Sequence, residues 1–351
     1  MNNKQLPYKK SDLARLTEER KKEHITIQLT RNVEYKNKTN LFEDVFLVHN
    51  ALPELDRSQV DMSTTFLRHT FSAPLMVAAI TGGAKIAEQI NKNIARSCQA
   101  LGIGMGLGSM KAMLVDPNLT YSYQVRDVAP NIFLAANIGA NDLKNFTPKV
   151  LNEALKKIGA DILAVHLNPA QELVQKEGET SFAGVLDLIK RYSQEVPMYV
   201  KEVGQGISDE VAQRLSKTAI QAIDVGGAGG TSWIGIEYLR RGMDDGPYWD
   251  WGIPTAMSLI LTRRATKLPL IATGGMRTGE EVVKALMLGA RISGIALPIL
   301  RVAARDYDAT KDELSKIVKE IGDVMFLLGA HTVSDLRNSK PLITGKLNEL
   351  I

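Results

Sequence analysis

The feature that most constrains this chain is an alternation of short apolar runs with longer stretches of helical period, from residue 74 onward. The runs are continuously apolar, which is typical of parallel strands buried on both faces. Amphipathic stretches such as 84–101 and 279–288 separate them, so repeated strand–helix units are predicted. The eight runs occupy residues 74–81, 102–109, 132–139, 160–168, 197–204, 222–230, 269–275 and 292–297.

Eight such units predict an α/β fold of the (β/α)8 barrel type. An open sheet is the alternative, but no nucleotide-binding GxGxxG motif follows the first run. The length of 351 residues also suits one barrel, since such barrels span about 200 to over 400 residues. We therefore expect residues 1–73 to form an N-terminal extension and residues 74–351 to form the barrel.

Composition excludes several classes of protein. A single cysteine, Cys98, rules out a disulfide framework and any cysteine-based zinc site. The net charge of +4 is too small and dispersed to indicate nucleic-acid binding. The first 22 residues are polar, and no apolar run approaches the roughly 18 residues of a membrane span. We expect a cytoplasmic protein that binds neither nucleic acid nor membranes.

In a barrel of this type, ligands bind in the loops after the strands. The segment TGGMRTGEE, residues 273–281, follows the seventh run and combines two glycines, Arg277 and the start of a helix. Backbone N–H groups, positive charge and a helix N-terminus all favour an anion, so a phosphate site is predicted there. The alternative is a simple tight turn.

Two further strand ends carry reactive groups. Lys201 lies within an apolar strand (YVKEV), where it needs a negative or electron-rich partner such as a reduced flavin; an outward-facing lysine is the alternative. The run HLNPAQE, residues 166–172, places Glu172 among amide and imidazole groups, which suits Mg²⁺. A helical ion pair of Glu172 with Lys176 explains the spacing equally well.

The N-terminal extension contains a helical segment that carries Arg20, Lys21 and His24 close together. Arg20 and His24 are four residues apart, so they lie on one face of a helix and form a cationic ridge. From the residues alone, a solvated helix end is the preferred interpretation. A lid that closes over an anionic ligand is the alternative.

Taken together, these motifs resemble the type 2 isopentenyl diphosphate isomerases, a family of FMN-dependent enzymes. The resemblance runs from Arg20 to about Leu300. It is carried by RKxxHI at 20–25, TGG at 81–83, HLNxxQE at 166–172, KEVGxG at 201–206, GAGGTxWxxxE at 227–237 and GGxRTG at 274–279.

The resemblance implies isomerisation of isopentenyl diphosphate to dimethylallyl diphosphate in isoprenoid biosynthesis. Reduced FMN would act as acid/base cofactor, with Mg²⁺ on the diphosphate, NADPH or NADH as reductant, and four or eight subunits. The implied flavin-binding residues are Ala79, Ile80, Thr81, Ser109, Asn137, Lys201, Thr231, Gly275, Met276, Arg277, Ala296 and Leu297. The implied substrate-binding residues are Arg20, Lys21, His24, Ser109, Met110, Lys111, Asn168 and Gln171. Glu172 would bind the metal, and the candidates for proton transfer are His166, Gln171, Trp233 and Glu237.

The chain departs from the family pattern at two places. Met110-Lys111 stands where the family commonly has Gln-Arg, which keeps the charge but loses the bidentate fork of arginine. Gly226 replaces a frequent serine before GAGGT.

Three other functions fit the residues less well. A flavin-dependent 2-hydroxy-acid oxidase would need a histidine in the stretch VGGAGGTSW, residues 225–233. An enzyme like inosine monophosphate dehydrogenase would need a nucleophilic cysteine on a barrel loop, whereas Cys98 lies within a predicted helix. A non-enzymatic flavin or nucleic-acid binder would leave His166, Gln171 and Glu172 unexplained.

Overall fold

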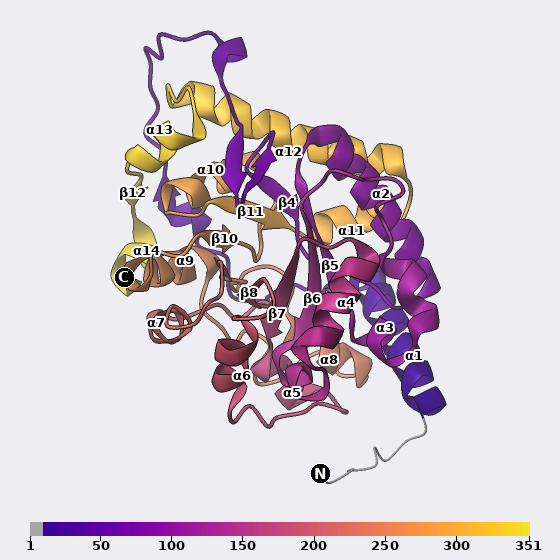
Figure 1. Ribbon diagram of the computed structural model, residues 1–351. Coiled ribbons are helices and arrows are strands. Elements are labelled where there is room, and N and C mark those ends of the chain that lie inside the picture. The colour runs from indigo at the N-terminus through magenta and orange to yellow at the C-terminus, as the bar shows by residue number, and fades with distance from the viewer. Residues whose placement is uncertain (1–9) are drawn as a thin grey trace.

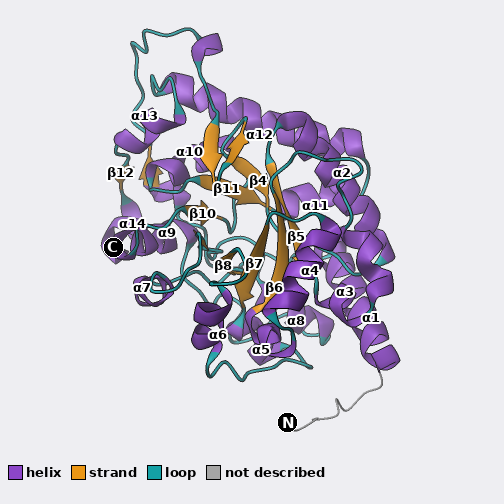
Figure 2. Cartoon of the chain, viewed as in Figure 1, coloured by secondary structure: helices purple, strands orange, loops and turns teal. Residues whose placement is uncertain are grey.

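The computed structural model describes the backbone of residues 10–351 and the side chains of residues 19–351. Its centre is a closed barrel in the strand order β10-β11-β4-β5-β6-β7-β8-β9, with every pairing parallel (Figures 1 and 2). Each of the eight predicted runs contains one barrel strand, so the predicted (β/α)8 fold is confirmed. The strands are β4 (Leu75–Val77), β5 (Gly104–Ser109), β6 (Leu134–Gly139), β7 (Ile162–Leu167), β8 (Met198–Glu202), β9 (Ile223–Asp224), β10 (Leu270–Ala272) and β11 (Ile292–Ile295).

Helices surround the barrel and bury their apolar faces against it (Figure 2). Local signals set their ends: Thr147 caps the helix that starts at Pro148, and Gly159 ends it with φ of 67°. The helices after β4 are α2 (Lys85–Leu101), α3 (Lys111–Val115), α4 (Pro148–Ile158), α5 (Pro169–Val174), α6 (Val185–Tyr192), α7 (Asp209–Leu215), α8 (Trp233–Arg240), α9 (Thr255–Ala265), α10 (Gly279–Met287), α11 (Leu297–Ala303), α12 (Tyr307–Leu327), α13 (Val333–Asn338) and α14 (Gly345–Leu350). Short 3-10 turns lie at Phe42–Asp44, Arg57–Gln59, Pro117–Tyr123 and Ala140–Asn145.

The amino-terminal end of the barrel is closed by side chains. A hairpin of β2 (Thr64–Phe66) and β3 (His69–Phe71) packs there, and the rings of Phe66 and Phe71 each lie 5.6 Å from that of Phe133. One buried cluster joins these rings to side chains of the barrel strands, including Met76, Ala164 and Tyr199. Because this end is filled, the space for a ligand lies at the carboxyl ends of the strands.

Helix α1 (Lys10–Thr30) continues well beyond His24 and packs beside α3, α8 and α11 (Figure 1). The cationic ridge therefore lies within a helix rather than at its end. The following residues, 31–40, run across the barrel loops, where the Tyr35 amide donates to Gly230 O at 3.0 Å. Farther along, β1 (Val45–Phe46) pairs antiparallel with β12 (Leu342–Ile343), which joins the extension to the C-terminal part of the chain. Among the described helices, none is both long and apolar enough to cross a membrane.

Candidate active site at the carboxyl ends of the strands

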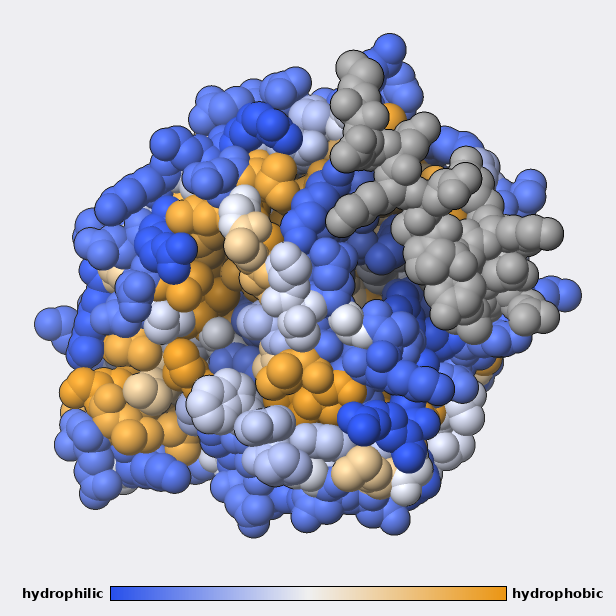
Figure 3. Space-filling view, turned by 90° about the horizontal axis from the view of Figure 1, so that it is seen from below, coloured by the Kyte–Doolittle hydropathy of each residue, from blue (hydrophilic) through white to orange (hydrophobic). Residues whose placement is uncertain are grey.

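A pocket opens where the carboxyl ends of the barrel strands meet the first helix. Figure 3 looks onto the molecule from this side, where hydrophilic residues and separate hydrophobic patches share the surface. Every site residue predicted above lines the pocket except Thr81, Met110 and Glu237. The lining residues that were predicted are Arg20, Lys21, His24, Ala79, Ile80, Ser109, Lys111, Asn137, His166, Asn168, Gln171, Glu172, Lys201, Thr231, Trp233, Gly275, Met276, Arg277, Ala296 and Leu297.

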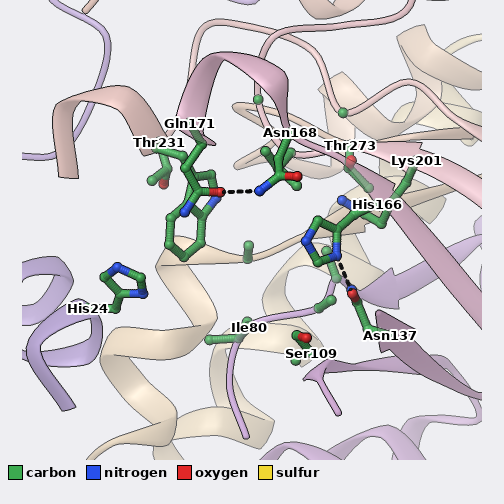
Figure 4. Close-up of a pocket in the computed structure, with 18 of the residues that line it drawn as sticks. His24, Ile80, Ser109, Asn137, His166, Asn168, Gln171, Lys201, Thr231 and Thr273 are labelled. Carbon is green, nitrogen blue, oxygen red and sulfur yellow. Dashed lines mark hydrogen bonds between the residues drawn. The ribbon is translucent and has the colours of Figure 1, made fainter. Parts of the chain in front are cut away.

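The floor of the pocket carries Lys201 beside a histidine–asparagine pair (Figure 4). Lys201 is buried and its ammonium donates to the backbone oxygen of Glu202, so the outward-facing alternative is wrong. His166 Nδ1 donates to Asn137 Oδ1 at 2.6 Å. Burial, reinforced by the charges of Lys201, Lys21 and Lys111, lowers the pKa of His166 to about 3. The imidazole is therefore neutral, and no group within the described part of the chain hydrogen-bonds to its Nε2.

Two glycine-rich loops form one wall of the pocket by touching backbone to backbone. A Cβ added to Gly274 would lie 2.1 Å from Gly227 O, and one added to Gly230 would lie 2.4 Å from Gly275 N. Only glycine permits this approach. Among the described residues, no acceptor takes the N–H groups of Gly275 or Met276. These unpaired donors, together with nearby Arg277, suit a phosphate.

The helix that follows this loop does not supply the anion site that the sequence suggested. At the N-terminus of α10, Glu281 accepts from the amides of Arg277 (2.7 Å) and Thr278 (3.1 Å). Glu320 of α12 accepts from the Gly279 amide at 2.8 Å. Protein carboxylates thus already occupy the helix N-terminus. The donors left for a phosphate are those of the glycine turn that precedes it.

The opposite side of the pocket is a cationic rim. Helix α1 presents Arg20 and Lys21, and Lys111 faces them from α3, where its ammonium lies 2.6 Å from Asp142 Oδ1. Burial, together with the charges of Arg20 and Lys111, lowers the pKa of Lys21 to about 8, and the charge of Asp142 opposes the shift. Positive groups are therefore crowded here, and a polyanion would relieve their repulsion.

Glu237, predicted as a proton-transfer group, lies behind the rim and does not line the pocket. It is 1% exposed, and its Oε1 accepts from His24 Nε2 (2.9 Å) and Gln171 Nε2 (3.2 Å). Its Oε2 accepts from Arg240 at 2.6 Å. Burial alone would raise the pKa of Glu237, but these hydrogen bonds and the charges of His24 and Arg240 lower it to about 2. Glu237 therefore acts through His24 and Gln171, which do line the pocket.

The arginine behind Glu237 fastens α1 to the barrel. Besides Glu237, Arg240 contacts Glu23 of α1 at 2.9 Å and Glu177 of the α5–α6 loop at 3.1 Å. Burial lowers the pKa of His24, and the hydrogen bond and charge of Glu237 oppose that shift. His24 packs edge-on against Trp233, with ring centroids 5.4 Å apart. The rim is held in place before any ligand arrives.

Glu172 forms no ion pair with Lys176, which removes the structural alternative proposed for it. Its carboxylate accepts from Asn168 Nδ2 at 2.8 Å and from the Glu179 amide at 2.7 Å, on the edge of the pocket. Among the described residues, no group of three or more histidine, cysteine or acidic side chains forms a metal cage. The donor set fits a cation such as Mg²⁺ that shares its shell with water and substrate oxygens.

Two further predicted residues lie outside the pocket. Met110, predicted to bind substrate, is fully buried in the main hydrophobic core, because the start of α3 turns its side chain away from the rim. Thr81, predicted to bind the flavin, is 2% exposed, and its Oγ1 has no partner among the described residues. For Met110 the predicted contact is wrong. For Thr81 the unpaired hydroxyl lies next to Ile80, which does line the pocket.

Several polar groups at or beside the pocket were not predicted from the sequence, and three of them contact predicted site residues or line the floor. Thr273 lines the floor, Asp142 pairs with Lys111, and Glu34 contacts Arg277 at 2.6 Å. Thr273 stands at the end of the seventh predicted strand, so its position alone was a usable signal. The partners of Asp142 and Glu34 are 31 and 243 residues away in the chain, and no local pattern connects them.

The sequence of this chain is similar to a family model and to named enzymes. A model of the FMN-dependent dehydrogenase family matches residues 14–118 and 138–342. The isopentenyl-diphosphate delta-isomerase of Thermococcus onnurineus is 46% identical, with 96% of this chain and 94% of that protein covered. The enzymes of the same name from Pyrococcus abyssi and Methanosarcina barkeri are 44% and 40% identical, and the alignments cover 94% of this chain and 93% of each relative.

Solved structures share the fold at lower identity. A lactate oxidase of Pediococcus acidilactici superposes with a TM-score of 0.67 at 17% identity, over 96% of this chain and 94% of that one. A flavocytochrome b2 variant with pyruvate bound has a TM-score of 0.66 at 18% identity, over 91% and 82% of the two chains. At this identity the likeness establishes the barrel fold alone.

Proposed function

The chain belongs to the type 2 isopentenyl-diphosphate delta-isomerases within the FMN-dependent dehydrogenase family, and from this membership we propose that it isomerises isopentenyl diphosphate to dimethylallyl diphosphate with reduced FMN. The observation that carries the proposal is one pocket with two kinds of site. Its glycine-rich wall and Lys201 suit a flavin, and its opposite rim is a cationic cluster that suits a diphosphate.

The wall residues fit the cofactor by their chemistry. The free amides of Gly275 and Met276, with Arg277, would hold the FMN phosphate. Lys201 would face the ring and stabilise negative charge on it. When bound and reduced, FMN supplies a flat ring that can give and take a proton without net redox change.

The rim residues would hold the substrate by its charged end. Arg20, Lys21 and Lys111 would contact the diphosphate, and Glu172 would hold a Mg²⁺ ion that offsets part of its negative charge. The hydrocarbon tail offers little to recognise, so the binding energy of the diphosphate would orient it against the ring. The departure from arginine to Lys111 is accommodated because Asp142 already orients the lysine.

Protonating an unactivated alkene needs a dry site and a positioned acid, because an alkene is a poor base. The pocket offers neutral groups for the accompanying proton steps: His166 Nε2, the Gln171 amide and the Trp233 ring edge. His166 is held in one tautomer by Asn137, and Gln171 is held by Glu237. We propose these groups as the candidates for proton removal and for shielding the cation-like transition state.

The remaining features of the proposal come from the family resemblance. NADPH or NADH would reduce the flavin, four or eight subunits would assemble, and the enzyme would work in the cytoplasm within isoprenoid biosynthesis. Sedimentation of the purified protein would measure the subunit number directly.

The decisive experiment combines a spectrum with a product count. The purified protein should bind FMN rather than FAD, and it should release product in excess of the NADPH supplied. One NADPH oxidised per product would point to a dehydrogenase or oxidase instead. A protein that takes up no FMN would refute the proposal.

A further inference from the structure

Asp224 is a buried carboxylate that the proposed function does not use. It ends β9 and is the register partner of Lys201 on β8 and of Ile271 on β10. Register partners on parallel strands point to the same face of the sheet. Because Lys201 faces the pocket, Asp224 lies inside the barrel, directly beneath the pocket floor. It is 2% exposed and does not itself line the pocket.

Three groups that line the pocket converge on this carboxylate from successive strands. Thr273, after β10, donates its hydroxyl to Asp224 Oδ1 at 2.6 Å. The Gly226 amide, after β9, donates to the same oxygen at 3.2 Å. The Lys201 charge, on β8, acts on the carboxyl through space. Asp224 thus hydrogen-bonds to groups at the ends of β9 and β10 and lies beside Lys201 of β8 in the register of the barrel.

Burial disfavours the charged form of this carboxylate, and its neighbours favour it. Burial raises the pKa of Asp224, whereas the Lys201 charge, the Thr273 hydroxyl and the Gly226 amide oppose the rise. A buried charge persists only when it is paired and hydrogen-bonded. Removing one member of such a pair leaves the other uncompensated.

Glu202 is the other acid next to Lys201, but it serves a different part of the structure. Its Oε2 accepts from the amides of Val203 (2.6 Å), Gly204 (2.7 Å) and Gln205 (2.5 Å), so it organises the loop after β8. Burial raises the pKa of Glu202 to about 7 even though these amides and the Lys201 charge oppose the rise. On the interior side of the barrel, Asp224 is therefore the acid that faces the lysine.

We infer that Asp224 is a positioning residue that holds Thr273 at the pocket floor and balances the charge of its register neighbour Lys201 toward a bound flavin. The inference rests on the proposed function for its flavin. An uncompensated ammonium would favour a reduced ring that has lost a proton and become anionic. With Asp224 beneath it, Lys201 orients the ring while the reduced ring keeps the protons that isomerisation requires.

The test replaces the charge while keeping the shape, in Asp224→Asn reconstituted with FMN. The two-electron reduction potential of the bound FMN should rise, because the Lys201 charge, no longer offset by a carboxylate, stabilises the reduced flavin. Each tenfold gain in the ratio of reduced to oxidised FMN affinity corresponds to about 30 mV. The pH at which the reduced flavin spectrum becomes anionic should fall. An unchanged potential and spectrum would overturn the inference.

A double-mutant cycle separates action through Lys201 from direct action on the ring. In a Lys201→Met background, Asp224→Asn should no longer raise the potential, because no lysine charge remains to be released. An equal rise in both backgrounds would show that Asp224 acts on the flavin directly, which contradicts the positioning role.

Thr273→Val keeps the inference testable if Asp224→Asn does not fold. It removes only the hydroxyl that stabilises the Asp224 carboxylate, so it should raise the reduction potential of FMN by less than Asp224→Asn does. A lowered potential would contradict the inference. Failure of the unaltered protein to bind FMN would refute the proposed function itself, whereas normal binding with no shift in either variant would refute only the role of Asp224.

Discussion

The floor and the rim of the pocket hold their charged side chains in different ways. On the floor, Lys201 and Asp224 are both buried and lie on rigid strands of the barrel. On the rim, Arg20 and Lys21 come from a helix outside the barrel, and Arg240 of α8 fastens that helix through Glu23. The floor is internally balanced. On the rim, Arg20 lies 3.7 Å from Glu177 and Lys111 lies 2.6 Å from Asp142, whereas Lys21 forms no ion pair among the described residues.

This difference indicates which kind of ligand the floor and the rim each suit. A balanced, hydrogen-bonded floor suits a cofactor that stays bound and must be held in one electronic state. A rim of crowded cations suits a polyanionic substrate that comes and goes, because its binding relieves repulsion already present. Variants of the rim should therefore affect turnover and leave cofactor content intact.

The largest expected effect is on the rim cations. Replacing Arg20 and Lys21 by alanine should lower kcat/KM by about 2–5 kcal/mol of transition-state stabilisation, if the diphosphate contacts are desolvated. FMN content and melting temperature should stay near those of the unaltered protein. The matched control is Arg31→Ala in the same segment, whose exposed pair with Asp244 should contribute little. Unaltered kinetics in the double variant would remove α1 from the substrate site.

Glu237→Gln tests how the rim is held. The buried carboxylate supports His24, Gln171 and Arg240, so its loss should cost about 1–3 kcal/mol in the free energy of unfolding. Turnover should also fall, because the glutamine amide has one acceptor oxygen, so either Arg240 or the His24–Gln171 pair loses its acceptor. Denaturant titration and steady-state kinetics measure the two effects. Normal FMN binding in this variant would support separate roles for the rim and the floor. A colourless protein would show that the rim also supports cofactor binding and would contradict that separation.

Glu172→Gln tests the metal on the rim. Losing one anionic ligand should raise the Mg²⁺ concentration needed for half-maximal activity by roughly tenfold or more, with FMN content unchanged. Glu179→Gln is the matched control, since its side chain pairs with Lys144 while only its backbone supports Glu172. Wild-type behaviour of Glu172→Gln at limiting Mg²⁺ would contradict the metal role.

The rim should also show its crowded charge as a pH dependence. Since the pKa of Lys21 is lowered to about 8, kcat/KM should fall as pH rises through 8, by up to about tenfold per pH unit. Lys21→Arg should abolish this fall, because arginine stays protonated. For folding the sign is opposite: the unfolded chain binds more protons between pH 8 and 10.5, so this group adds stability as pH rises through that window. A profile that is flat above pH 8 would show that Lys21 does not titrate in the free enzyme.

The smallest expected effect concerns Met110. Met110→Leu conserves volume in the core, so it should change the free energy of unfolding by less than about 1.5 kcal/mol and leave KM unchanged. A raised KM would restore Met110 to the substrate site.

Much of the architecture could be predicted from the sequence. Strands buried on both faces must be continuously apolar, and ligands in this fold must lie after them, so the barrel and most lining residues followed from local pattern. The glycine pairs at 229–230 and 274–275 were visible because a close backbone approach requires glycine.

What only the tertiary structure decided is which groups pair across the barrel. Met110 and Lys111 are neighbours in sequence, but the turn into α3 sends one into the core and the other to the rim. Local patterns determine burial and direction along a strand. Hydrogen bonds such as those of Glu237 with His24 and of Asp224 with Thr273 join residues 213 and 49 positions apart. The charge state of each site depends on these distant partners, because in a buried site burial and neighbouring charges together set every pKa.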